Sequence, residues 1–68
     1  MDIKQQIGVN IARIRREQNI SQEELAFRSG LHRTYISGVE RGVRNPTITV
    51  LSEIAAALKV SLSDLVQA

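Results

Sequence analysis

Residues 21–42 constrain the fold of this 68-residue chain more than any other segment, because they predict two short helices joined by a tight turn. Ser21 and Glu24 have the spacing of a capping box, in which each side chain accepts from a backbone N–H of the other residue. The first helix should therefore run from residue 22 to about residue 28. Gly30 follows where the chain must turn sharply, since a left-handed backbone costs glycine no Cβ clash. The segment thus predicts a helix, a turn over residues 29–31 and a second helix.

The second helix should begin after His32, a poor N-cap, and end at Gly42, a typical C-terminal stop. At about 100° per residue, its side chains divide into two faces. One face is apolar, with Tyr35, Ile36 and Val39, and the other is polar, with Arg33, Thr34, Ser37 and Arg41. The apolar face should pack against the rest of the domain, which leaves the polar face exposed.

Arginines and short hydroxyls are the side chains that base edges and phosphates require. Arginine donates two hydrogen bonds to guanine, and serine or threonine adapts to either kind of partner. We expect Arg33, Thr34 and Ser37 to contact bases, with Arg41 beside them, and the Tyr35 hydroxyl to reach the DNA backbone or an outer base. The alternative for any one arginine is simple solvation, and the helix, turn and helix arrangement is what favours DNA.

The runs QEELA at residues 22–26 and ISGVERG at residues 36–42, together with Gly30, resemble the helix-turn-helix family that includes the phage Cro and repressor proteins. The resemblance covers nearly the whole chain. Within that family, residues 32–48 are most similar to the controller proteins of restriction-modification systems, small dimeric regulators that time expression of the endonuclease gene. The resemblance implies one all-α, five-helix, lambda-repressor-like domain over residues 1–68. It also implies a homodimer on a two-fold symmetric operator, with the second motif helix in the major groove of double-stranded DNA.

The first helix of the chain is expected over residues 3–18, where Ile7, Ile11 and Ile14 have the spacing of a buried stripe. Arg15 follows this stripe. In related domains an arginine at this place pairs with the glutamate that Glu40 matches. The resemblance therefore implies a partly buried ion pair that ties the first helix to the end of the second motif helix.

The loop after Gly42 contains an Asn-Pro step, which favours a turn and excludes helix. In the family this loop runs along the DNA backbone, which assigns Asn45 to a phosphate and Arg44 to a phosphate or an outer base. Turn chemistry alone is the alternative for Asn45. Gln22, at the positive end of the first motif helix, is expected to hold a phosphate. Gly38 is expected to leave space for close approach of the DNA.

A fourth helix should start after Thr47 and run to about residue 59, with one stripe of side chains facing the core. That stripe contains Ile48, Leu51, Ala55 and Leu58. Ser61 and Asp64 form a second capping box, which opens a short last helix. The remaining apolar side chains are the candidate dimer interface, with core packing as the alternative: Val50, Ile54, Ala57, Leu62, Leu65 and Val66.

Charge and composition agree with a small regulator. Residues 1–45 carry eight Lys or Arg against five Asp or Glu, a net charge of +3, whereas residues 46–68 have a net charge of −1. Cysteine is absent, and the lone His32 has no partners at the spacing of a metal site or catalytic triad. We therefore expect no enzyme activity, cofactor, metal or small-molecule effector. With no signal peptide or membrane span, a cytoplasmic location is expected.

Two other roles on the same fold stay open at the level of sequence. An antitoxin would use the apolar surface of the last two helices to bind a protein partner, and a phage-type repressor would act without a restriction system nearby. For a controller protein the expected partners are double-stranded DNA, a second copy of the chain and, where it activates transcription, RNA polymerase.

Overall fold

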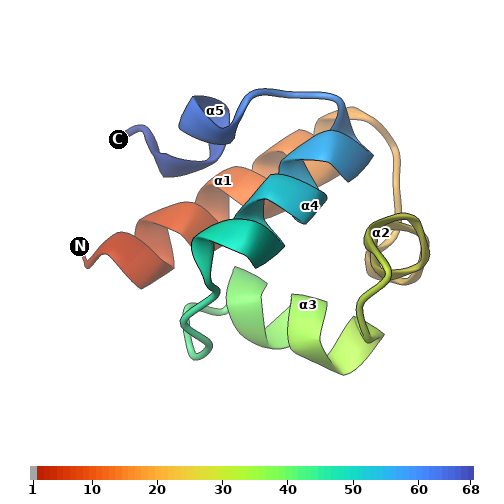
Figure 1. Ribbon diagram of the computed structural model, residues 1–68, viewed down its shortest axis with the longest axis horizontal. Helices are drawn as coiled ribbons and strands as arrows, with labels where there is room; N and C mark the ends of the chain where they lie inside the picture. The colour runs from red at the N-terminus through yellow and green to blue at the C-terminus, as the bar shows by residue number, and fades with distance from the viewer. Residues whose placement is uncertain (1) are drawn as a thin grey trace.

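The computed structural model describes residues 2–68, which form five α-helices (Figure 1). They are α1 (Ile3–Glu17), α2 (Gln22–Ser29), α3 (Arg33–Glu40), α4 (Ile48–Leu58) and α5 (Leu62–Val66). The all-α, five-helix prediction is therefore confirmed. Between α2 and α3 the chain turns at Gly30, whose φ of 72° lies in the left-handed region. This is the turn that the glycine predicted.

Four of the helices formed by residues 2–68 begin at a side chain that accepts a backbone N–H, namely Asp2, Ser21, Thr47 and Ser61. Only Ser61 forms the full capping box, with Asp64. The box predicted at Ser21 is half formed, because the Glu24 carboxylate accepts instead from Arg28 Nε at 2.7 Å. His32 precedes α3 without any side-chain capping bond.

The helices enclose one apolar core. Its fully buried large side chains come from all five helices: Ile11, Leu25, Ile36, Val39, Ile54, Leu58 and Leu65. Helix α1 contacts α3 and α5, helix α2 contacts α3 and α4, and α4 contacts α5. In Figure 1, α3 lies along the lower edge of the molecule and α5 lies at the opposite edge. Helix α3, the second helix of the predicted motif, therefore lies at one side of the domain.

Two expectations for the last helices are wrong. Ile48, expected in the core, is 65% exposed, because it is the first residue of α4 and does not pack against the core cluster. Ile54 and Leu65, expected at a dimer interface, are both 0% exposed. The buried side chains of α4 are Leu51, Ile54, Ala55 and Leu58. Because Ile54 and Leu65 belong to the core of the monomer, their side chains cannot contact a second copy.

A buried asparagine holds α5 against α1. Asn10 Nδ2 donates to the carbonyl oxygens of Leu65, at 2.9 Å, and Gln67, at 2.7 Å. Its own side-chain oxygen accepts from Gln6 Nε2 at 3.3 Å. The short last helix is therefore kept in place by directional hydrogen bonds as well as by burial of Leu65.

No helix within residues 2–68 combines the length and the apolar character needed to cross a bilayer.

Candidate nucleic-acid interface

Helix α3 has the two faces that its sequence predicts. Ile36 and Val39 are buried, Arg33 and Thr34 are exposed, and Ser37 is half-buried. Tyr35 is half-buried and packs against the core. A polar hollow of about 200 Å³ runs between the start of α2 and the exposed face of α3, lined by Gln22, Arg33, Thr34 and Ser37. The residues expected to touch bases therefore share one surface with a residue expected to touch a phosphate.

The ion pair expected between Arg15 and Glu40 is present. Arg15 Nε donates to Glu40 Oε2 at 2.7 Å and Nη2 donates to Oε1 at 3.0 Å, a bidentate arrangement. The two side chains are only 10% and 5% exposed. Arg15 Nη1 also donates to the Ile20 carbonyl at 2.8 Å. This pair joins α1 to the last residue of α3.

The hydrogen bond to Glu40 raises the pKa of Arg15 above its ordinary value, against the lowering effect of burial. A raised arginine pKa stabilises the fold at every pH below the ordinary value and is lost only as the pH rises through the raised one. The arginine therefore keeps its charge throughout the range in which the protein can work.

Gln22 is linked to the same pair. Its Nε2 donates to Glu40 Oε1 at 3.0 Å, so that one carboxylate oxygen accepts from both Gln22 and Arg15. Because the Gln22 amide carries two N–H groups, it can donate one to Glu40 and offer the other to a phosphate. The sequence assigned Gln22 to DNA alone, and it did not indicate that the start of α2 is joined to the end of α3.

Close backbone packing at Gly8 was also missed by the sequence analysis. A Cβ at Gly8 would lie 2.5 Å from the Glu40 carbonyl oxygen and closer still to that of Val39. Because both contacts are with backbone carbonyl oxygens, a larger residue at position 8 could be accommodated only if α1 and α3 moved apart. A glycine within an otherwise regular helix was the available signal for such an approach.

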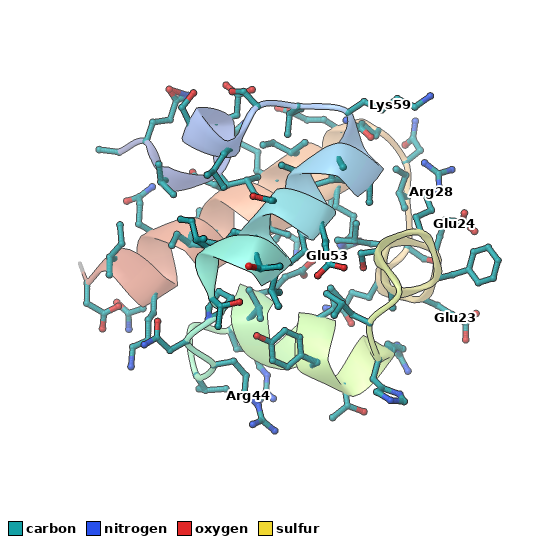
Figure 2. All side chains as sticks on the ribbon, viewed as in Figure 1. Glu23, Glu24, Arg28, Arg44, Glu53 and Lys59 are labelled. Atoms are coloured by element: carbon teal, nitrogen blue, oxygen red, sulfur yellow. The ribbon has the colours of Figure 1, made fainter. Side chains whose placement is uncertain are left out.

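The loop after α3 returns along the helix. The N–H groups of Val43 and Arg44 both donate to the Gly38 carbonyl, at 3.0 Å and 3.3 Å. A Cβ at Gly38 would lie 2.6 Å from Arg44 Cγ. The expectation that Gly38 leaves space for DNA is therefore wrong, because the stem of Arg44 occupies that space. Figure 2 shows the Arg44 side chain at the lower edge of the molecule, beside α3.

The remaining expected site residues are accessible. Arg41, Arg44 and Asn45 are exposed. Of the expected dimer residues, Val50, Ala57 and Leu62 are half-buried and pack against the edge of the core, and Val66 is 38% exposed. These four therefore remain available to a second copy, on helices other than the one with the exposed polar face.

Two helices joined by a left-handed glycine turn, with a polar exposed face on the second helix, define a DNA-binding domain of the helix-turn-helix class. A helix-turn-helix family model matches residues 11–65. The chain therefore belongs to the helix-turn-helix family.

Relatives within this family are regulators. Over 66 residues the chain is 50% identical to an uncharacterised HTH-type transcriptional regulator, y4dJ, of Sinorhizobium fredii, covering 97% of this chain and 86% of the relative. It is 49% identical over 65 residues to control protein C.SmaI of Serratia marcescens, covering 96% and 77%. It is also similar to the restriction-modification controller protein C.Esp1396I, solved as a tetramer with its natural 35 base-pair operator. That likeness has a TM-score of 0.85 at 36% identity and covers 98% of this chain and 99% of the controller. The resemblance to controller proteins is confirmed, and the chain is a helix-turn-helix transcriptional regulator.

Proposed function

We propose that this protein is an autoregulatory controller of a restriction-modification system, which binds a two-fold symmetric operator as a homodimer. The observation that carries the proposal is the polar face of α3, where Arg33 and Thr34 are exposed while Ile36 and Val39 of the same helix are buried. The similarity to control protein C.SmaI and to the operator-bound controller tetramer supports this choice among helix-turn-helix regulators.

In this proposal α3 enters the major groove. Arg33, Thr34 and Ser37 contact base edges, with Arg41 beside them and the Tyr35 hydroxyl at an outer base or the backbone. Around this helix, Gln22, Arg44 and Asn45 contact the sugar-phosphate backbone, with Arg44 also able to reach an outer base. The phosphate contacts set the register of the domain on the DNA, and the base contacts select the sequence.

Dimerisation doubles the set of base contacts. Val50, Ala57, Leu62 and Val66 form the proposed interface, which leaves α3 free in both copies. The α3 helices of the two copies should then enter successive major grooves about 34–36 Å apart. We propose that residues 1–68 act as one domain in the cytoplasm, that binding and not catalysis is its activity, and that RNA polymerase is the partner where the controller activates.

A mobility-shift titration tests this function, with DNA from immediately upstream of the protein's own gene and random DNA of equal length as control. A homodimer that neutralises about six phosphates should lose affinity about a thousandfold between 50 and 200 mM salt. We expect a sequence-specific complex that forms in steps of one dimer. Binding no tighter than to random DNA would contradict the proposal.

Sedimentation of the free protein tests the dimer separately. At micromolar concentration the mass should be twice the monomer value of 7.6 kDa. A monomer at every concentration would contradict the symmetric operator even if the protein bound DNA.

A further inference from the structure

The aliphatic stem of the Arg44 side chain lies across α3 at Gly38, where the helix has no side chain. Gly38 is buried although it follows Thr34 by four residues, on the side of α3 that is otherwise polar. The reason is Arg44, since its Cγ, Nε and Cδ are the three atoms nearest to a Cβ built at Gly38, at 2.6, 3.5 and 3.6 Å. Glycine is thus the residue that lets this side chain pass over the helix.

The backbone supports the same placement. Two successive N–H groups, those of Val43 and Arg44, converge on the Gly38 carbonyl. Gly42, with a φ of 78°, makes the reversal that brings the loop back to this position. Both the backbone N–H and the side-chain stem of Arg44 therefore contact Gly38, while Arg44 itself remains exposed.

We infer that Gly38 is a positioning residue, which holds the guanidinium of Arg44 beside the base-reading face of α3 so that the loop extends the DNA contact. The role of Arg44 toward DNA rests on the proposed function, whereas its coupling to Gly38 does not. An arginine has several rotatable bonds, and a stem held against the helix loses less freedom on binding than one that is free in solution. Any larger residue at position 38 must displace the stem, because Cγ can move away only by rotation about the Cα–Cβ bond of Arg44, which carries the rest of the side chain with it.

A double-mutant cycle on operator affinity tests this inference. Gly38→Ala should weaken binding about tenfold, within the range for losing one arginine contact. Arg44→Ala should weaken it at least as much. In the Arg44→Ala background, the further change Gly38→Ala should alter the affinity less than about twofold, since the displaced atoms are gone. If the loss of affinity in the double variant equals the product of the two single losses, the two residues act independently and the inference is overturned.

Arg41 supplies the matched control. It is another exposed arginine at the end of α3, but its Nε donates to the Ser37 carbonyl at 3.3 Å, and none of the three atoms nearest to Gly38 belongs to it. The effects of Gly38→Ala and Arg41→Ala should therefore multiply. Coupling as strong as that with Arg44 would overturn the assignment to Arg44.

Thermal unfolding without DNA separates this inference from the proposed function. Alanine is a better helix former than glycine, so that Gly38→Ala should raise Tm by about 4–8 °C in the Arg44→Ala background. In the wild-type background the crowded stem should cancel this gain. An equal rise in Tm in both backgrounds would overturn the inference, even if the protein binds its operator. Because this measurement needs no DNA, it tests the contact between Gly38 and Arg44 even if no specific operator exists. Should Gly38→Ala alone fail to fold, the double variant must fold for the inference to stand.

Discussion

The two ends of α3 are held in different ways. At its C-terminal end, Glu40 is paired with Arg15, and the backbone of this last turn lies directly against Gly8 of α1. At its N-terminal end, His32 makes no capping bond, and the next two residues, Arg33 and Thr34, are exposed. The end that is held by these contacts is thus not the end that carries Arg33 and Thr34, the first of the side chains proposed to contact bases.

This difference shows how a small domain can fix the orientation of a helix and still leave part of it exposed. Directional contacts at one end set the position and tilt of α3, and the other end is left accessible to DNA. Residues at the held end should therefore affect folding far more than sequence preference, and residues at the accessible end the reverse.

Removal of Arg15 should have the largest effect. Arg15→Ala leaves the Glu40 carboxylate buried without its main partner, which should lower the free energy of unfolding by about 3–5 kcal/mol. Urea denaturation measures this change. The control is Arg13→Ala, which breaks the exposed pair with Glu17, whose side chains are 49% and 63% exposed, and should cost less than about 0.5 kcal/mol. Similar losses in the two variants would show that the buried pair does not hold α3.

Gly8→Ala should be nearly as damaging. Helix propensity alone predicts a gain of about 1 kcal/mol, but the new Cβ would collide with two backbone carbonyls of α3. Because these atoms cannot rotate away, we expect a net loss of about 3 kcal/mol. Val9→Ala, at the neighbouring half-exposed position, should change the unfolding free energy by less than about 0.5 kcal/mol. A stabilised Gly8→Ala protein would mean that α1 and α3 can separate without penalty.

Arg33→Ala should act on DNA instead of on folding. We expect a loss of about 1–3 kcal/mol in operator binding and a relaxed preference at the contacted base pair. Asn45→Ala, at a proposed phosphate contact, should weaken all DNA sequences about equally. Competition titrations with operator and random DNA separate the two patterns, and denaturation should leave both variants within about 0.5 kcal/mol of wild type. The same pattern for both residues would contradict the assigned roles.

His32→Ser should have the smallest effect, and it should be favourable. A serine at the N-cap of α3 can accept the backbone N–H that His32 leaves without a side-chain partner, which should stabilise the fold by about 1 kcal/mol. The midpoint of urea denaturation measures the gain. No gain would mean that the N-terminal end of α3 is already as well held as the C-terminal end.

Much of the fold follows from local sequence patterns. The caps at Ser21, Thr47 and Ser61 and the turn at Gly30 are short-range features, so that the helix boundaries could be predicted closely. The polar face of α3 could be predicted as well, because it depends only on the helical period. The ion pair between Arg15 and Glu40 needed the resemblance, since these residues are 25 positions apart.

The expectations that were wrong depend on where elements meet. Helix α4 is apolar over a wide arc, and periodicity alone does not tell which edge of the arc faces the core. Ile54 was therefore placed outside and Ile48 inside. Gly38 shows the same limit, because nothing in its local sequence indicates that the side chain of Arg44 returns to cover it.

The hydrogen bonds from Asn10 have a consequence for how the protein is made. They join a residue of the first helix to carbonyls 55 and 57 positions later. Contacts this distant in sequence close late, because the intervening chain must first be ordered. The last helix, and with it Leu62 and Val66 of the surface proposed for dimerisation, cannot take its final position before residue 67 has been synthesised. In the proposed dimeric mode of binding, a nascent chain that has not reached residue 67 lacks part of its pairing surface and does not yet contribute to control of the operator.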